Sequence, residues 1–291
     1  LGAGKASEAD GSVSFVGGFS HEAAFSMVLI TCFAVASFAP RLHPALRVGL
    51  LTACVIGIFA ANYRTALIAL APLAIGFFTF STTRSFTSRQ RTFVGAATLI
   101  GAIGVTILAA WALRERMADI AVAAGDDAIF KPPGEFNQTE RDLFSGRIYL
   151  WSSYLHAYFA GDDIRILFGF GPDAWVGLFS KYAHNTVISY LYEFGLFGAV
   201  LIVCVWIGML MRARTIPDPW LRGQMLFAHA GFIILNFATM PHWQLEGLIL
   251  YGLLCGYTIA LTSRARVPRA YRPNVIPLPA LPSRPASGGN A

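Results

Sequence analysis

Long apolar runs recur along this sequence, and they limit what the chain can fold into. A hydrocarbon core roughly 30 Å thick is crossed by about 20 mostly apolar helical residues, and about seven runs reach or approach that length. Only 13% of the 291 residues are charged, which is about half of the share usual in soluble domains. We therefore predict an all-α fold, a polytopic transmembrane helix bundle. The runs cover residues 23–39, 46–61, 66–80, 92–113, 186–211, 222–240 and 245–262.

The second and third runs are short, which leaves two arrangements open. Either each run crosses the membrane, or the two form a re-entrant hairpin that turns at Asn62-Tyr63-Arg64-Thr65. Both arrangements place Arg64 near a membrane boundary.

The distribution of Lys and Arg predicts the orientation, because short cytoplasmic loops collect these residues and translocated loops do not. Every second loop is basic, and we place those loops in the cytoplasm. The long segment 114–182 contains more acidic than basic residues, so we place it on the outer face with the N-terminus and the turns at Arg64 and His242. The net charge of +6 therefore reflects topology and gives no support to nucleic-acid binding. The basic loops contain Arg41 and Arg47; Arg84, Arg89 and Arg91; Arg212, Arg214 and Arg222; and Arg264, Arg266, Arg269 and Arg272.

These patterns divide the chain into five segments. Residues 1–22 form an external N-terminal segment of a chain that does not open with Met, and we expect it to be a fragment that lacks earlier spans. Residues 23–113 form four transmembrane helices, 114–185 a large outer loop, and 186–262 three more transmembrane helices. Residues 263–291 are rich in Pro, Ser and Arg and are expected to be a disordered cytoplasmic tail.

An interfacial helix is predicted within the large outer loop. Ser145 is a suitable cap for a helix whose apolar positions recur at helical spacing. Aromatic side chains on its flanks are of the kind that settles at the headgroup level of a membrane. The apolar positions are Ile148, Trp151, Leu155 and Phe159, and the flanks carry Tyr149, Tyr154, His156 and Tyr158.

Arg147 falls in the first turn of this helix. A cation is not favoured there by the helix dipole, so an anion shared by the free backbone N–H groups and the guanidinium is one explanation. A pairing of Arg147 with Asp142 or with a lipid phosphate is the other.

A second polar group lies where the chain enters the fifth span. Asn185 follows His184 and is a suitable helix cap, and polar residues then continue at helical spacing along one face to Glu193. An ionisable residue within a span is costly unless it faces a bundle interior or a wet cavity. Glu193 therefore marks the wall of a cleft or makes a structural hydrogen bond to a neighbouring helix.

Two further residues are candidates for substrate contact. His21 lies just outside the first span, where it lines the path of an acceptor or is a surface histidine. Arg141 contacts anionic sugars or phosphates, or it forms an ordinary ion pair within the loop.

Three motifs give the chain a family resemblance. They are Arg64 in a short external turn, Ser145-Gly146-Arg147 with Trp151 behind it, and Leu167-Phe168-Gly169-Phe170-Gly171-Pro172 followed by His184-Asn185-Thr186 and Glu193-Phe194-Gly195-Leu196-Phe197-Gly198. With them, residues 18–261 resemble the O-antigen ligases and related surface-polysaccharide polymerases, which share a C-terminal membrane domain. One departure is Tyr63, since the family commonly has Ser directly before the arginine.

The resemblance implies a multi-spanning glycosyltransferase of the bacterial inner membrane, with its catalytic loop in the periplasm and its C-terminus in the cytoplasm. The donor would be a glycan on a polyprenyl diphosphate, and the acceptor a sugar hydroxyl on the lipid A core or on a growing glycan. Arginine forks compensate a diphosphate well, which suits Arg64 and Arg147. A histidine can accept the acceptor proton near neutral pH, which makes His184 the candidate base. Asn185, Glu193, Arg141 and His21 are the candidate substrate-binding residues.

No metal and no other cofactor is expected. The acidic pairs Asp126-Asp127 and Asp162-Asp163 are adjacent rather than spaced as D-x-D, and no H-E-x-x-H sequence occurs. One attack with a departing diphosphate needs no enzyme nucleophile, so we expect inversion at the anomeric carbon.

Two other function classes stay open at this point. A transporter or flippase of lipid-linked sugars would also need an external cleft with cations, although the inverted repeats typical of many transporters are not evident in the sequence. A noncatalytic scaffold of a polysaccharide assembly complex would have little need of His184 beside an arginine-rich loop.

Overall fold

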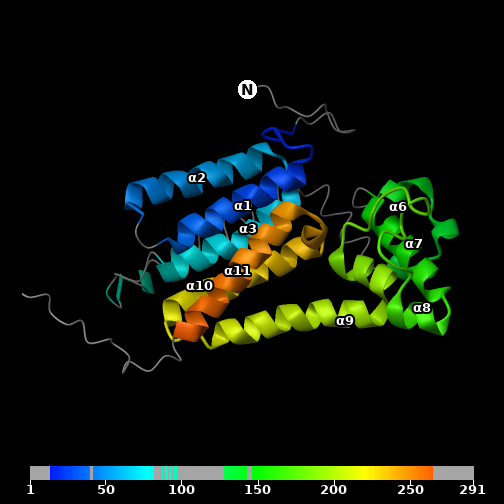
Figure 1. Cartoon of the computed structure of the whole chain (residues 1–291). Coiled ribbons are helices and arrows are strands. Elements are labelled where there is room, and N and C mark those ends of the chain that lie inside the picture. The colour runs from blue at the N-terminus through cyan, green and yellow to red at the C-terminus, as the bar shows by residue number, and fades with distance from the viewer. Residues whose placement is uncertain are drawn as a thin grey trace, which may run out of the picture.

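The computed structural model describes residues 14–39, 42–81, 128–142 and 146–264, with positions 87, 89–90, 92–93 and 95–96. Within these residues the chain is helical, and one isolated β-bridge joins Val176 and Phe179. Six helices form a bundle: α1 (Glu22–Phe38), α2 (Pro44–Ala60), α3 (Arg64–Gly76), α9 (Thr186–Arg214), α10 (Pro219–Asn236) and α11 (Leu245–Arg264). Figure 1 shows a smaller lobe of helices at one end of this bundle.

The lobe consists of residues 128–142 and 146–183. It contains the short helices η3 (Ala128–Phe130), η4 (Pro133–Glu135) and α6 (Gln138–Asp142), followed by α7 (Arg147–Phe159) and α8 (Asp163–Phe168). Two further short helices belong to the bundle: η1 (Phe77–Ser81), which is a π-helix, continues α3, and η6 (Pro241–Trp243) joins α10 to α11.

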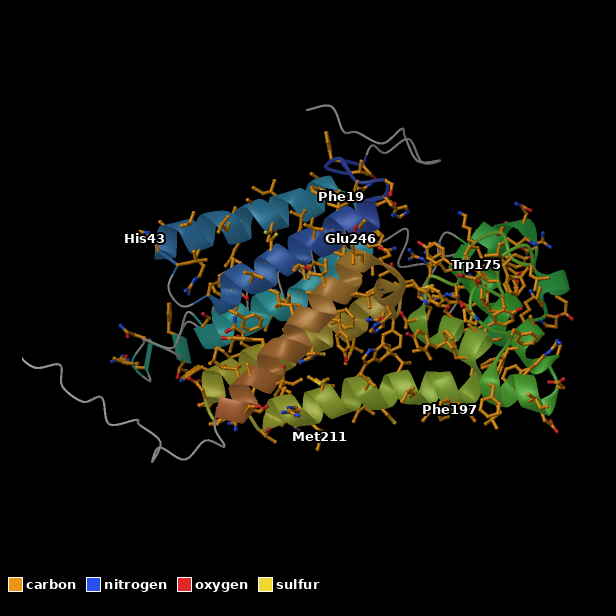
Figure 2. All side chains as sticks on the ribbon, viewed as in Figure 1. Phe19, His43, Trp175, Phe197, Met211 and Glu246 are labelled. Carbon is orange, nitrogen blue, oxygen red and sulfur yellow. The ribbon has the colours of Figure 1, made fainter. Side chains whose placement is uncertain are left out.

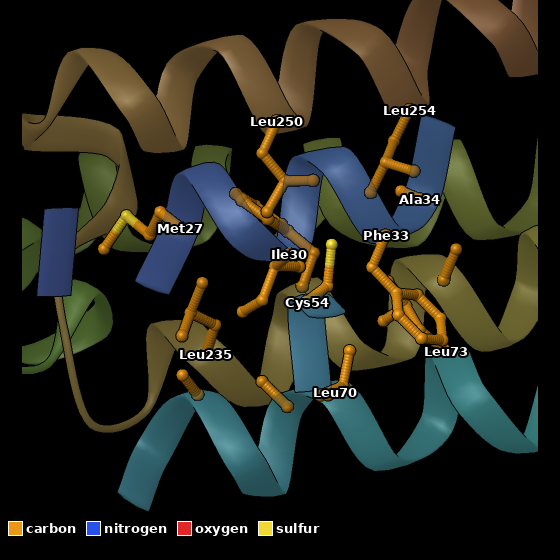
Figure 3. Packing of buried hydrophobic residues seen from close by; sticks show 14 of the residues in the cluster. Met27, Ile30, Phe33, Ala34, Cys54, Leu70, Leu73, Leu235, Leu250 and Leu254 are labelled. Carbon is orange, nitrogen blue, oxygen red and sulfur yellow. The ribbon is translucent and has the colours of Figure 1, made fainter. Parts of the chain in front are cut away.

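A hydrophobic core holds the bundle together. Figure 3 shows Ile30 and Phe33 of α1 among leucines of the helices around them, including Leu70 of α3, Leu235 of α10 and Leu250 of α11. The outside of the bundle is also apolar, because side chains such as those on α2 and α9 are large, apolar and exposed. A surface of this kind suits hydrocarbon better than water.

Six of the seven predicted spans fall on described residues, and each of them is a helix. Two helices, Thr186–Arg214 and Leu245–Ser263, are long and apolar enough to cross a membrane, and three shorter ones are apolar: Glu22–Phe38, Ala45–Ala60 and Thr65–Ser81. The predicted span 92–113 and the predicted tail 263–291 lie almost entirely outside the described residues.

The connection between α2 and α3 is a tight turn, at the position that the sequence predicts. Asn62 takes a left-handed conformation with φ 53°, and Tyr63 is the N-cap residue of α3, which begins at Arg64. This turn lies at the end of the bundle that faces the lobe (Figure 1). The start of α3 therefore lies on the same side of the bundle as the lobe.

The predicted helix after Ser145 is present, but two of its predicted features are wrong. Its N-cap is Gly146, in a left-handed conformation with φ 79° and with no side-chain cap; Ser145 itself lies outside the described residues. Tyr154 and Tyr158, predicted on the flanks, are buried in the core of the lobe. Every fourth position of α7 beginning at Leu150 contributes to this core, because the helix packs against α9 and the loop after α8.

A break divides α9, which the sequence predicts as one continuous span. Gly195 has the non-helical angles φ 67° and ψ −166° and separates two helical segments, residues 186–194 and 196–214. The first segment contacts the lobe, and the second runs along the bundle (Figure 1).

The break coincides with a direct contact between two backbones, which we call the glycine junction. Phe170 N–H donates to the Tyr192 carbonyl and Gly171 N–H to the Glu193 carbonyl, both at 2.9 Å. A Cβ atom at Gly169 would lie 2.3 Å from the Glu193 carbonyl carbon, and one at Gly195 would lie 2.4 Å from the Leu167 carbonyl oxygen. Only glycine permits this approach, so two glycines of the family motifs join the lobe to α9.

Replacing Gly195 or Gly169 by Ala should destabilise the protein by roughly 2–5 kcal/mol, because positive φ and steric overlap both add cost. Thermal unfolding in detergent measures the effect. Gly208→Ala is the matched control: its Cβ would meet open space within α9, and it should stabilise by roughly 0.5–1 kcal/mol. Equal unfolding temperatures for all three variants would contradict the glycine junction.

Candidate functional site

His184 lies in the loop that leads from the lobe into α9, and hydrogen bonds hold the residues around it. Trp151 Nε1 of α7 donates to the Ala183 carbonyl at 2.7 Å, and the Tyr154 hydroxyl donates to the Lys181 carbonyl at 3.2 Å. His184 itself has φ 51°, a left-handed conformation that is uncommon for any residue other than glycine. Strained backbone of this kind is found at functional sites when the surrounding structure enforces it.

Asn185 anchors the other side of His184 to the bundle. Its Oδ1 caps α9 by accepting from the N–H groups of Val187 and Ile188 at 3.0 and 3.2 Å, and its Nδ2 donates to the Phe237 carbonyl at 3.1 Å. The predicted cap is confirmed. Both ends of the Asn185 amide are thus occupied by hydrogen bonds that hold this residue, next to His184, in place.

Thr186 reinforces this anchor. Its hydroxyl donates to Asn236 Oδ1 of α10 at 2.7 Å, and both side chains are buried. The start of α9 is therefore fixed to the end of α10 by consecutive residues of the predicted His184-Asn185-Thr186 motif.

The surroundings of His184 are cationic. Burial, together with the charges of Arg147, Lys181 and His21, lowers the pKa of His184 from 6.5 to about 4. The imidazole is therefore neutral at neutral pH and is able to accept a proton. Its ring lies 4.1 Å from the ring of Tyr182, centroid to centroid. Arg147 and Lys181 thus bring positive charge to one neutral base.

Arg147, predicted beside His184, begins α7 and is partly exposed. Among the described side chains no ion pair to Arg147 occurs, and the side chain of Asp142, its predicted alternative partner, lies outside them. The α7 N-terminus also has no side-chain cap. The guanidinium and the first N–H groups of α7 are therefore suited to an anion.

Arg64 is the first residue of α3, and its side chain lies outside the described residues. The preceding residue, Tyr63, belongs to the site. Burial raises the pKa of the Tyr63 hydroxyl, while Thr239 and Arg147 act in the opposite direction. The hydroxyl is thus a proton donor close to Arg147.

The sequence reasoning missed several residues of this site. The sequence patterns mark Tyr63 only as a departure from the family, and they give no indication of Lys181, Tyr182 or Glu22 as site residues. Burial raises the pKa of Tyr182; the nearby Tyr63 and Glu22 act in the same direction, and Arg147 acts in the opposite direction. The one available signal was position, since Tyr63 is adjacent to Arg64, and Lys181 and Tyr182 closely precede His184.

His21 is brought to the site, where it also has a structural contact. Its Nδ1 accepts from Ala23 N–H at 3.1 Å and so caps α1, and its Nε2 lies 3.4 Å from a carboxylate oxygen of Glu22. His21 is also one of the neighbouring groups that lower the pKa of His184.

Glu193 and Arg141 have other partners in the structure. Glu193 is 1% exposed; it accepts from the Ser189 hydroxyl of α9 itself at 2.7 Å and from Asp173 N–H of the loop after α8 at 2.9 Å. Its hydrogen bonds are therefore structural, but neither of them goes to a neighbouring helix. The Arg141 guanidinium lies 5.1 Å from the centroid of the Tyr149 ring. No described contact joins either residue to His184.

The residues around His184 do not resemble a metal centre. Among the described residues, no group of three or more His, Cys, Asp or Glu side chains is arranged to hold a metal ion. The glycine-rich segment also makes no phosphate loop, because Phe170 and Gly171 donate their N–H groups to α9.

The left-handed conformation of His184 predicts a difference between two variants that both lack the imidazole. His184→Gly should be more stable than His184→Ala by about 1 kcal/mol, because glycine adopts positive φ without steric cost. Thermal unfolding of the two proteins in the same detergent measures this. Equal stability, or a more stable alanine variant, would contradict the strain at position 184.

Comparison with known proteins gives one family. The sequence profile of the O-antigen ligases matches residues 48–203, which is more than half of the chain and includes Arg64, Arg147 and His184. No curated protein and no solved structure matches the chain. The matched region contains most of α2, all of α3, the lobe, the glycine junction and the first part of α9. The chain therefore belongs to the O-antigen ligase family, a family of bacterial membrane proteins.

Proposed function

We propose that this protein transfers a glycan from a polyprenyl diphosphate carrier to a sugar hydroxyl, at the periplasmic face of the inner membrane. The observation that carries the proposal is the neutral imidazole of His184 close to the positive charges of Arg147 and Lys181. Glycan transfer from a diphosphate needs both of these elements, a base for the acceptor and positive charge for the leaving group. The O-antigen ligase family supports the same class of reaction.

Arg147 and Arg64 are proposed to hold the donor diphosphate. Negative charge grows on the diphosphate as the bond to the anomeric carbon breaks, and preorganised cations stabilise charge that develops in this way. Arginine offers a planar fork for phosphate oxygens. Arg147 begins a helix of the lobe and Arg64 begins a helix of the bundle, so the diphosphate would lie between the two parts.

His184 is proposed to prepare the acceptor. Its imidazole takes the proton of the sugar hydroxyl while the hydroxyl oxygen attacks the anomeric carbon, and the diphosphate leaves with the bonding electrons. A single displacement of this kind inverts the anomeric centre and needs no covalent intermediate. The arginines supply the charge compensation, so we propose that the reaction needs no metal ion.

His184→Ala should lower the transfer rate by about 10²–10⁴-fold, as expected for loss of a general base. Arg147→Ala and Arg64→Ala should lower it by about 10²–10³-fold or more, because each removes charge compensation from the leaving group. The assay uses purified protein with a polyprenyl diphosphate glycan and a sugar acceptor in the presence of EDTA, and it measures the new glycosidic bond.

Two control variants remove a histidine and an arginine that lie outside the proposed site. His43 is exposed before α2 and lies in Figure 2 at the far end of the bundle from the lobe, and Arg165 is exposed and lies over the ring of Phe170. His43→Ala and Arg165→Ala should keep most of the activity. Wild-type transfer by His184→Ala or Arg147→Ala would refute the site, and movement of the lipid without a new bond would instead indicate a flippase. If the wild-type protein neither formed a glycosidic bond nor moved the lipid, it would be a scaffold.

The choice between ligase and polymerase depends on the acceptor. A ligase transfers the glycan to the lipid A core, and a polymerase transfers it to a growing glycan on a second carrier. Deletion of the full gene distinguishes the two, since either the decorated lipid A or the long glycan disappears from the cells.

The pKa of His184 predicts the pH dependence of transfer. A base must be unprotonated, so kcat/KM should be constant above about pH 5 and should fall as the pH drops through about 4. Removing a neighbouring cation by Lys181→Gln raises the pKa of His184, so this limb should move to higher pH. A pH–rate profile of both proteins between pH 3.5 and pH 8 would test this, and an acid limb at pH 6.5 in the wild type would contradict the cationic setting.

A further inference from the structure

The short helix α8 presents an apolar face that no described part of the protein covers. Ile164, Leu167 and Phe168 have exposed fractions of 72%, 45% and 58%. Residues three and four positions apart lie on one face of a helix, so the three side chains point the same way. Ile166 lies on the opposite face and packs against the core of the lobe. α8 therefore has one side directed into the lobe and another that is apolar and uncovered.

This uncovered face continues onto the membrane-spanning part of α9. The ring of Phe168 lies 6.3 Å from the ring of Phe197, centroid to centroid. Phe197 and Leu196 directly follow the break at Gly195, and their exposed fractions are 60% and 49%. Among the described residues, α9 is one of two helices that are long and apolar enough to cross a membrane. The apolar surface thus passes from a spanning helix to the lobe without interruption.

The helix predicted to lie on the membrane has a different surface. Ile148 and Leu155 of α7 are buried, so most of its predicted apolar stripe is covered by the protein. Phe159 at its C-terminal end is exposed and is separated from α8 by only three residues. Between α7 and α8, the exposed apolar surface therefore belongs to α8 and to the last residue of α7.

We propose that these residues form a membrane-contact surface, the α8 patch, which lies in the boundary between lipid headgroups and acyl chains next to α9. Apolar side chains of an interfacial helix reach about 5–10 Å into this boundary. Asp163 and Arg165 are exposed on the other sides of α8, where headgroups and water accommodate charge. The α8 patch consists of Phe159, Ile164, Leu167, Phe168, Leu196 and Phe197.

Phospholipid is the occupant that fits best, because the patch is continuous with the surface of a spanning helix and carries charges only at its border. Large exposed apolar surfaces of this kind mark contacts with membranes or with other proteins. The proposal does not depend on glycan transfer, since it concerns only the depth of the lobe in the membrane.

Photo-crosslinking in nanodiscs with radiolabelled phospholipid tests the α8 patch. A photoreactive benzophenone side chain replaces Phe168 in one variant, Phe197 in a second and Glu135 in a third. Phe197 follows the break in the spanning helix, and Glu135 is an exposed polar position in η4 of the lobe. These exposed positions tolerate a large side chain, and gel filtration confirms that each variant is folded.

We expect the yield of phospholipid adduct at position 168 to be close to that at 197 and at least about tenfold above that at 135, because an interfacial side chain contacts lipid continuously. An adduct yield at 168 equal to that at 135 would show that α8 faces water. A crosslink at 168 between two protein molecules would show that a second copy covers the patch. Either result overturns the proposal.

Discussion

The glycine junction is the contact on which the arrangement of this protein depends. Lobe and bundle are joined where the backbone around Gly169 touches the backbone around Gly195, at the point where α9 breaks. The approach is possible because neither residue has a side chain, and two backbone hydrogen bonds from Phe170 and Gly171 hold it in place. The break separates two segments of α9: the first links the loop at His184 to α10, and the second runs along the bundle.

The site combines two requirements that oppose each other. A diphosphate needs positive charge nearby, but positive charge weakens a neighbouring base. Burial and the nearby charges of Arg147 and Lys181 lower the pKa of His184 to about 4, so the imidazole is neutral at neutral pH and is intrinsically a weak base. An anion bound between the cations would offset their charge and raise the pKa of the imidazole toward neutral pH. The base would then be strongest when the donor is present.

The sequence predicts helices well here, because apolar length and periodicity are local properties. The run 23–39 corresponds to α1 at 22–38, and the position of Arg147 at the start of a helix is also correct. The break at Gly195 could not be predicted from the apolar run, since its cause is the backbone of Leu167, far away in sequence.

The site residues also divide into those that the neighbouring sequence predicts and those that only the folded structure brings together. His184 and the helix cap Asn185 follow from local patterns, whereas the contribution of Tyr63 depends on the fold, which brings it close enough to Arg147 for the charge of Arg147 to affect its pKa. The loop before α9 has a further consequence, because Trp151 of the lobe holds one side of His184 and the link from Asn185 to α10 holds the other. A ligand that binds Arg147 of the lobe and Arg64 of the bundle would therefore also bind the two parts to each other. By thermodynamic linkage, donor binding and the docking of the lobe would strengthen one another by the same free energy.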